Sequence, residues 1–471
     1  MLVVLLLVAS AVLRSCVVNP VTGKKDVLVM SEQREKALGA SYDPQIEATM
    51  GFYDDPKLER FITEKGTAMA RVSHRPKLGF QFKIVDSPVV NAFAVPGGYV
   101  YFTRGILAHF NNEAEFAGVL GHEIGHVTAR HSAKQMRNAN LAQIGIVAGA
   151  IAFPDQFMQF GDLAQQGLGL LLLKNGRDDE SESDKLGVQY STKIGYDAKE
   201  MAGFFRTIDR IGEKSGQEIP TFLSTHPDPA NREVRVREMA QAVQSKAGSR
   251  QFAVNRNSYL RRIDGLLYGE DPKQGFIENN KFYHPVLKFY FPIPRNWRTS
   301  NSPSQFQMAS PDGTAMAILM MAAEKSLEQA ANAALQKNGL TLIESQQIRV
   351  NGLPALAMIS ERPNELRVLT YLIQYDNRIY KLHGLSLPQN FNGVVRQFQS
   401  IFDNFDRLTD PSKLNKQPER VKIVTVKGNT SLRQALVSNG TPSSRLNELA
   451  ILNGMELNEN IPSGTLIKVV R

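Results

Sequence analysis

Residues 112–126 read NEAEFAGVLGHEIGH, and this segment decides how the first half of the chain folds. Asn112 is followed three positions later by Glu115, a pairing that resembles a capping box and predicts that a helix begins here. We expect this helix to run to about residue 133 and its apolar residues to be buried. His122 and His126 are four positions apart, so their side chains share one face of the helix.

The pentapeptide 122–126 has the form H-E-x-x-H, which predicts a zinc site when it lies in a helix of this kind. The imidazoles of His122 and His126 converge on one Zn²⁺ ion, and the carboxylate of Glu123 lies about 100° further round the helix, beside the ion. Zinc lowers the pKa of a bound water towards ~7, so that a neighbouring carboxylate can take its proton during attack on a peptide carbonyl. The alternative is a chance pentapeptide that places two histidines on a helix surface.

A catalytic zinc usually has a third protein ligand. The metzincin pattern requires a glycine and a histidine at positions occupied here by Ala129 and Ser132, so that class is excluded. His131 lies five residues beyond His126, and a continuing helix would point its side chain elsewhere.

A downstream acidic segment offers the missing ligand. Glu180 and Asp184 are four positions apart on a helix predicted from about residue 178 to 194. One of the two carboxylates can bind zinc, while the other accepts a hydrogen bond from a ligand histidine and fixes its tautomer. The alternative is a solvated acidic face.

Three motifs together carry a family resemblance: the H-E-x-x-H helix, the Glu-x-x-x-Asp helix, and residues 91–99, which read NAFAVPGGY. Over about residues 19–245 the chain resembles the zinc metalloendopeptidase family that includes HtpX, BepA and the CAAX prenyl protease, with the exported BepA-like branch the best fit. Ser183 stands where this family usually has alanine. The resemblance implies one Zn²⁺ per chain, with Glu123 as the catalytic base and three ligands: His122, His126 and Glu180.

Residues 224–227, which read STHP, and the following Arg232 are also similar to the BepA-like branch. We expect Asp184 and Arg232 to support the ligands without binding the ion. His226 could add a fourth zinc ligand in a resting state, or donate a hydrogen bond to the oxyanion during catalysis. The alternative is a loop histidine near the start of a helix predicted over residues 229–245.

The segment around residues 79–103 has the period-two pattern of a small sheet. Its residues Asn91, Ala92 and Phe93 could bind an extended substrate as an added strand beside the zinc, since such pairing demands little of the substrate sequence. The alternative is an ordinary core strand.

The first 13 residues, MLVVLLLVASAVL, have the length of a signal-peptide core and are too short for a membrane span. The following Leu13-Arg14-Ser15-Cys16 resembles a bacterial lipobox. We therefore predict a lipoprotein signal peptide over residues 1–16, export to the periplasm, and a lipid on Cys16 that anchors the protein to the outer membrane. The alternative is a plain signal peptide followed by a fortuitous cysteine.

A second apolar run lies at residues 141–153. It is too short for a membrane span and predicts a buried or lid helix.

The predicted fold class is α+β, in three domains. Residues 17–248 form a mainly helical zincin-type metalloprotease domain with a small sheet. Residues 276–408 alternate strands with two helices and resemble a PsbP/Mog-like sandwich. Residues 421–471 resemble a LysM module with βααβ order, and the alternative for them is a generic βααβ cap. A LysM module implies binding to peptidoglycan.

Composition limits the possible functions. The single cysteine excludes an internal disulfide and a cysteine-rich zinc module. The net charge of +9 comes without a nucleic-acid-binding motif, so we expect no nucleic-acid partner. The favoured function is an exported zinc endopeptidase acting on misfolded or unassembled envelope proteins. The alternatives are a chaperone-like or peptidoglycan-binding factor with a resting zinc site, and a peptidoglycan hydrolase.

Overall fold

The computed structural model describes residues 16–23, 25–27, 30–135, 175–215, 221–227, 231–248 and 250–471. The predicted signal sequence up to residue 15 and the predicted lid helix at residues 141–153 lie outside them. Within the described part of the chain, every helix is too short or too polar to cross a membrane.

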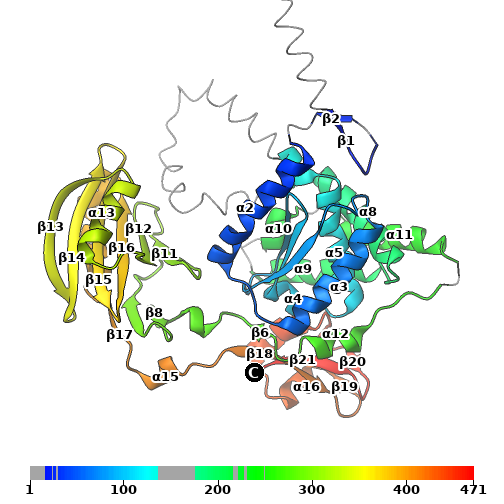
Figure 1. Ribbon diagram of the computed structural model, residues 1–471. Coiled ribbons are helices and arrows are strands. Elements are labelled where there is room, and N and C mark those ends of the chain that lie inside the picture. The colour runs from blue at the N-terminus through cyan, green and yellow to red at the C-terminus, as the bar shows by residue number, and fades with distance from the viewer. Residues whose placement is uncertain are drawn as a thin grey trace, which may run out of the picture. The chain divides into compact units, whose positions relative to one another are not determined.

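The chain divides into two compact units, coloured by residue number in Figure 1. The first unit comprises Met1–Gly269 and Glu419–Arg471, and the second comprises Glu270–Pro418. The end of the chain thus returns to the unit that contains the H-E-x-x-H segment. The boundaries predicted from sequence, at residues 248, 276, 408 and 421, stay predictions.

The first unit is mainly helical. The N-terminal end of the H-E-x-x-H helix forms as predicted, because the Asn112 side chain accepts a hydrogen bond from the backbone N–H of Glu115 at 2.7 Å. The predicted end near residue 133 is wrong: the helix ends at Thr128, and Arg130 takes a left-handed φ of 61°. The helices are α2 (Glu32–Met50), α3 (Pro56–Val72), α4 (Arg104–His109), α5 (Glu113–Thr128), α8 (Arg177–Lys193), α9 (Glu200–Ser215), α10 (Thr221–Thr225), α11 (Arg232–Ser245) and α12 (Arg256–Arg262).

A small sheet lies where the period-two pattern predicted it. Its strands are β3 (Gln81–Val85), β4 (Ala92–Val95) and β5 (Tyr99–Thr103), in the order β3-β5-β4. Strand β5 runs parallel to β3 and antiparallel to β4, so β4 is an edge strand. A separate pair, β1 (Cys16–Val18) and β2 (Lys25–Val27), is antiparallel.

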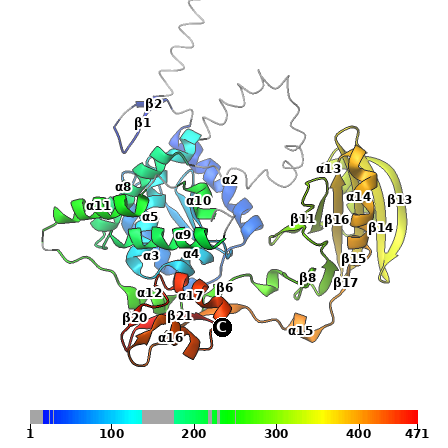
Figure 2. The same ribbon diagram turned by 180° about the vertical axis from the view of Figure 1, so that it is seen from behind.

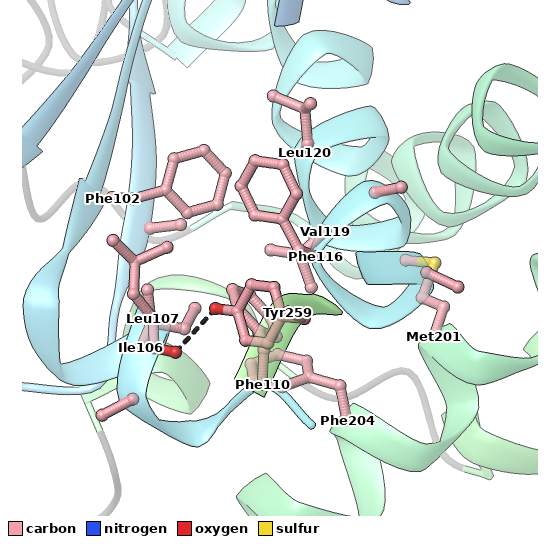
Figure 3. Packing of buried hydrophobic residues seen from close by; sticks show 14 of the residues in the cluster. Phe102, Ile106, Leu107, Phe110, Phe116, Val119, Leu120, Met201, Phe204 and Tyr259 are labelled. Carbon is pink, nitrogen blue, oxygen red and sulfur yellow. Dashed lines mark hydrogen bonds between the residues drawn. The ribbon is translucent and has the colours of Figure 1, made fainter. Parts of the chain in front are cut away.

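Helix α5 runs through the centre of the core, and all of its residues are buried. Aromatic rings of α5, β5 and α12 pack against each other at its N-terminal half, as Figure 3 shows. Phe116 lies 5.1 Å from Phe102, measured between ring centroids, and the Tyr259 hydroxyl donates to the carbonyl of Leu107 at 2.7 Å. This packing fixes the helix before it reaches the two histidines.

Glycines allow α5 and α8 to approach until their backbones touch. A Cβ atom added to Gly121 would lie 2.9 Å from the Cα of Gly187, and one added to Gly187 would lie 2.9 Å from the carbonyl oxygen of Gly118. Real Cβ atoms do not come this close, so any larger residue would push the helices apart. The contact brings the histidines of α5 opposite the acidic start of α8.

The C-terminal segment of the first unit shares its hydrophobic core. Its elements are β18 (Glu419–Thr425), β19 (Thr430–Ser431), α16 (Leu432–Ser438), the 3₁₀ turn η2 (Ser443–Arg445), α17 (Leu446–Leu452), β20 (Asn460–Ile461) and β21 (Leu466–Val470). Strand β18 pairs antiparallel with β21 and with β6 (Leu267–Tyr268). The predicted βααβ order is confirmed, whereas the LysM resemblance stays a prediction.

A buried lysine fastens this segment to the peptidase helices. The ammonium group of Lys468 donates to the carbonyls of Ala108 and Phe110, at 2.8 and 2.9 Å. These carbonyls lie at the end of α4, just before α5 begins. In both views the C-terminal elements lie beside α12, as Figure 2 shows from behind.

The second unit is rich in antiparallel sheet. Seven strands follow the order β10-β11-β12-β16-β15-β14-β13, and a smaller sheet has the order β17-β9-β8-β7. Helix α14 packs with Tyr371 and Ile373 of β15, whereas α13 packs with the intervening Leu372, so the two helices cover opposite faces. The bounds are η1 (Pro272–Gln274), β7 (Phe276–Glu278), β8 (Lys281–His284), β9 (Phe289–Pro292), β10 (Arg298–Asn301), β11 (Gln305–Ala309), β12 (Met316–Met321), α13 (Leu327–Lys337), β13 (Thr341–Val350), β14 (Leu353–Arg362), β15 (Leu366–Tyr375), β16 (Arg378–Ser386), α14 (Pro388–Phe402), β17 (Asp406–Arg407) and α15 (Pro411–Leu414).

Candidate metal centre

Four buried side chains meet between α5, α8 and the segment that follows α10. Each offers one nitrogen or oxygen atom, and these atoms all lie within 4.8 Å of one another. The group contains the three ligands that the family resemblance implied and the histidine whose role was open: His122, His126, Glu180 and His226.

The distances within this group match the coordination of zinc. The Nε2 atoms of His122 and His126 are 2.9 Å apart, and the carboxylate oxygens of Glu180 lie 3.3 and 3.2 Å from them. Four ligand atoms placed at zinc's usual bond lengths on a tetrahedron would be about 3.4 Å apart. Three imidazole nitrogens and one carboxylate oxygen are also the donor types that zinc takes. The residues therefore fit a zinc ion.

Charges around Glu180 favour its ionised form. Burial alone would raise the pKa of Glu180, but the imidazoles of His226, His122 and His126 lower that pKa well below its usual value. An ionised carboxylate is the form that binds a metal ion.

The predicted supporting residues lie behind His122. Its Nδ1 atom is 3.0 Å from a carboxylate oxygen of Asp184, and Arg232 donates to the two oxygens of Asp184 at 2.7 and 2.9 Å. Burial raises the pKa of Asp184, but Arg232 and His122 outweigh burial and lower it. An ionised Asp184 holds the proton of His122 on Nδ1 and leaves the Nε2 lone pair for the metal.

Arg232 is itself held in place from two sides. Its guanidinium lies 3.1 Å from Glu180 and stacks over the ring of Phe205, 4.0 Å from the ring centroid. One cation thus contacts both carboxylates of the α8 pair, so Asp184 and Glu180 can both stay ionised although each is buried.

The predicted base, Glu123, is fully buried beside the ligands. Its two carboxylate oxygens make no hydrogen bond to a described residue, and one lies 3.7 Å from the Nε2 atom of His226. Burial raises the pKa of Glu123. A buried carboxylate that accepts no hydrogen bond is costly, which indicates that this one is kept for a molecule that enters the site.

Both ring nitrogens of His226 have partners. Nδ1 lies 3.0 Å from Glu180 and 3.3 Å from the Nε2 atom of His122, while Nε2 donates to the carbonyl of Ala92 at 3.2 Å. The ring also stacks on Phe222, with centroids 4.6 Å apart. The Ala92 carbonyl thus keeps the proton on Nε2 and leaves the Nδ1 lone pair facing the other ligands.

The predicted substrate strand lies beside the metal centre, but its three residues differ in what they contact. Ala92 contacts His226 through its carbonyl, as described above. The backbone N–H of Asn91 donates to Thr103 at 3.2 Å, and the ring of Phe93 stacks on Tyr101 at 5.0 Å. Asn91 and Phe93 therefore also serve the core, as the alternative interpretation expected.

Two contacts of the ligands were missed from the sequence. The expectation that His131 points away is wrong: its Nδ1 atom lies 2.9 Å from the Nδ1 atom of His126. The expectation assumed a continuing helix, whereas the left-handed Arg130 turns the chain back. Asn175, two residues before α8, brings its amide within 3.5 Å of both His126 and His226. A lone asparagine before a helix carries no signal that would identify it.

A buried H-E-x-x-H helix with a glutamate ligand from a second helix defines a zinc-metallopeptidase site. Residues 56–240 match the sequence model of peptidase family M48. The resemblance to the HtpX, BepA and CAAX prenyl protease family is thereby confirmed.

Curated relatives match a part of the chain. A beta-barrel assembly-enhancing protease from Yersinia pestis is 31% identical over 224 residues, which are 45% of this chain and 45% of that protein. The mitochondrial metalloendopeptidase OMA1 of Arabidopsis thaliana is 31% identical over 180 residues, 38% of this chain and 35% of that protein. The chain therefore spans less than half the length of these relatives.

One solved structure resembles a smaller part of the chain. Cyanobacterial PsbP from Synechocystis sp. PCC 6803 is 10% identical, with 27% of this chain and 91% of that chain covered and a TM-score of 0.24. The PsbP/Mog-like fold of residues 276–408 stays a prediction.

Proposed function

We propose that this protein is a zinc-dependent endopeptidase that cleaves misfolded or unassembled proteins of the bacterial cell envelope. The observation that carries the proposal is the buried carboxylate of Glu123, which makes no hydrogen bond to a described residue, beside a zinc-type ligand set. The M48 domain supports the reaction class. The relatives named as beta-barrel assembly-enhancing proteases support a substrate of the envelope.

The chain's residues divide the tasks of peptide hydrolysis. Zinc, when bound, polarises the substrate carbonyl and lowers the pKa of water. Glu123 takes the proton of the attacking water and returns it to the leaving nitrogen. Because burial raises its pKa, this carboxylate is a stronger base than an exposed glutamate. Asp184 and Arg232 hold His122 and Glu180 in position.

The geometry of His226 favours the resting cap over the oxyanion donor. Its Nδ1 atom faces the other ligands, and its Nε2 proton is engaged by Ala92. An oxyanion donor would need a free N–H directed at the substrate. With His226 as a fourth ligand, the position that water and substrate require is closed.

The edge of β4 suggests how a substrate opens this cap. An extended substrate that pairs with this edge needs the Ala92 carbonyl as an acceptor, which is the group that holds His226. Pairing would thus release His226 and open the metal. A peptide substrate methylated on the one backbone nitrogen that pairs there should be cleaved more slowly than the parent peptide, and equal rates would count against the strand.

The experiment that tests the function pairs metal analysis with casein cleavage. We expect the wild type to hold one zinc per chain and to cleave casein, and Glu123→Gln to keep the zinc and lose the activity, because the amide keeps the shape without the base. Glu47→Gln, an exposed position on α2, is the matched control and should behave as the wild type. Cleavage by Glu123→Gln at the wild-type rate would refute the role of Glu123.

A second experiment decides the role of His226. If it caps the metal, His226→Ala raises basal casein cleavage, because the fourth position opens. If it serves the oxyanion, the same variant loses activity by roughly 10²-fold with its zinc content unchanged. The direction of the change separates the two roles.

The closed ligand set also favours a second candidate, a chaperone-like factor whose zinc stays at rest. Such a factor would suppress aggregation of an unfolded client equally well as wild type and as Glu123→Gln. The endopeptidase proposal instead requires that loss of the base removes the measurable effect on the client.

Location and partners complete the proposal. The signal sequence and Cys16 support export to the periplasm and a lipid anchor in the outer membrane, and the βααβ segment at residues 421–471 supports binding to peptidoglycan. Sedimentation with purified peptidoglycan tests the last point. A protein that stays in the supernatant would leave this segment as a structural part of the peptidase unit.

A further inference from the structure

The two histidines of the H-E-x-x-H helix are supported in different ways. The Nδ1 atom of His122 contacts a carboxylate directly, that of Asp184. The Nδ1 atom of His126 contacts a second imidazole instead, that of His131, at 2.9 Å. The two rings meet edge to face, with their centroids 5.0 Å apart and their planes at 74°. His131 therefore occupies for His126 the place that Asp184 occupies for His122.

A strained turn places His131 there. Helix α5 ends at Thr128, and Arg130 adopts a left-handed φ of 61°, which is uncommon for a residue other than glycine. The Arg130 side chain is anchored to α2 and to the segment just before it, since its Nε atom lies 2.5 Å from Glu35 and its guanidinium donates to the carbonyl of Met30 at 2.7 Å. Strain of this kind persists when the surroundings hold it, and it often marks a functional position.

The contacts of His131 define which nitrogen carries its proton. Its Nε2 atom lies 3.0 Å from the carboxylate of Glu182 and 3.3 Å from that of Asp179, so Nε2 donates to these carboxylates. Nδ1 is then free to accept, and Ser183 also places its hydroxyl 3.3 Å away. Because His131 is fully buried, these residues decide its orientation.

This arrangement in turn orients His126. When His131 accepts at Nδ1, His126 donates its Nδ1 proton and keeps the Nε2 lone pair, which faces Glu180 and His122. A hydrogen-bonded series thus runs from the carboxylates at the start of α8, through His131, to a metal ligand. Helix α8 supplies one ligand itself and supports another through this series.

We propose that His131 is a positioning residue that fixes the tautomer and ring orientation of His126, and that it thereby sets the affinity of the centre for zinc. The proposal rests on the proposed function only in taking zinc as the ion. Residues that orient a ligand in this way typically change metal affinity by 10- to 100-fold when they are replaced.

The test measures zinc affinity by competition with a chromophoric chelator on the full-length protein. We expect His131→Leu to bind zinc about 10- to 100-fold more weakly than the wild type. His131→Asn can still present an oxygen to His126, so it should recover most of the affinity. Tyr190→Phe is the matched control. Tyr190 lies on α8, as do the carboxylate partners of His131, but its hydroxyl is directed to His74 and Thr128, so this variant should bind zinc as the wild type does.

A spectroscopic readout separates positioning from a general loss of structure. With Co²⁺ in place of zinc, the visible absorption bands report the ligand geometry, and His131→Leu should shift them while Tyr190→Phe should not. If His131→Leu does not fold, the double variant Asp179→Ala, Glu182→Ala removes the acceptors of the His131 proton at partly exposed positions and should weaken zinc binding in the same direction.

The proposal would be overturned if folded His131→Leu kept the wild-type zinc affinity and an unchanged Co²⁺ spectrum. It would also be overturned if His131→Leu and His131→Asn bound zinc more weakly than the wild type and equally weakly as each other. Zinc binding by a wild type that does not cleave casein would refute the proposed function and leave the comparison of affinities decisive.

Discussion

Replacing Gly454 with alanine tests how the C-terminal segment is fastened to the peptidase helices. Gly454 follows α17 with a left-handed φ of 64°, and a Cβ atom there would lie 2.7 Å from the amide nitrogen of Asn111, just before α5. Gly440 follows α16 with a φ of 85° and has open space around its Cα. Both glycines come after an asparagine, and both donate a backbone hydrogen bond of 2.9 Å to the preceding helix. The two substitutions therefore differ in the contact with Asn111.

The expected magnitudes follow from these surroundings. A left-handed alanine costs about 1–2 kcal/mol, which reduced freedom of the unfolded chain offsets by about 0.4–1 kcal/mol, so Gly440→Ala should cost about 1 kcal/mol. In Gly454→Ala the amide of the buried Asn111 must also move and give up its hydrogen bond to the carbonyl of His109. A buried polar group left unpaired costs about 1–3 kcal/mol. We therefore expect Gly454→Ala to cost about 2 kcal/mol more than Gly440→Ala.

Urea unfolding of the full chain measures this difference. Trp297 is the single tryptophan and belongs to the second unit, so its fluorescence reports that unit, while far-UV circular dichroism reports both. Gly454→Ala should move the circular-dichroism transition and leave the tryptophan transition in place. In an Asn111→Ala background the two glycine variants should become equally costly. Equal costs in the wild-type background would refute the inferred contact between Gly454 and Asn111.

Three further predictions use other sites. Glu180→Ala should lower the zinc content measured by atomic emission, because it removes a ligand that both histidines face; an unchanged content would assign that place to another carboxylate. Burial lowers the pKa of His383 to about 4, below its value in an unfolded chain, so the second unit should lose stability as the pH falls from about 6.5 to 4, and His383→Gln should flatten the tryptophan-detected stability profile over that range. Cys16→Ala should release the protein from the membrane fraction without changing its circular-dichroism spectrum, and continued sedimentation with membranes would point to another attachment.

Local signals in the sequence were sufficient for most of the elements. The two helices of the βααβ order predicted for residues 421–471 are confirmed as α16 and α17, and the strands and helices predicted within residues 276–408 form there, β15 and β16 among them. Strand β10 was missed, because its residues RTSN are polar and exposed and show no alternation. An alternating hydrophobic pattern identifies a strand with one buried face. Strand β10 lies at the edge of its sheet and has no such pattern.

The site shows the same division between local and distant information. The pairing of His122 with His126 follows from helix spacing. The same spacing on a second helix gives Glu180 and Asp184 as candidates, and the family resemblance assigns the ligand role to Glu180. The position of His131 depends on the left-handed turn at Arg130, which an ion pair with the distant Glu35 holds in place. The attachment of Lys468 to the carbonyls that precede α5 joins residues about 360 positions apart. No local pattern carries contacts of that range.

The glycine contact between α5 and α8 has a consequence for how the protein acquires its metal. The separation of the two ligand-bearing helices is set by backbone meeting backbone, with no flexible side chain between Gly121 and Gly187. The ligands are therefore arranged by the protein core before any ion arrives, unlike those of small domains that fold only around their zinc. The heat-capacity change on metal binding should consequently be small, and binding should order few residues. Removal of zinc by a chelator should leave a folded and refillable protein.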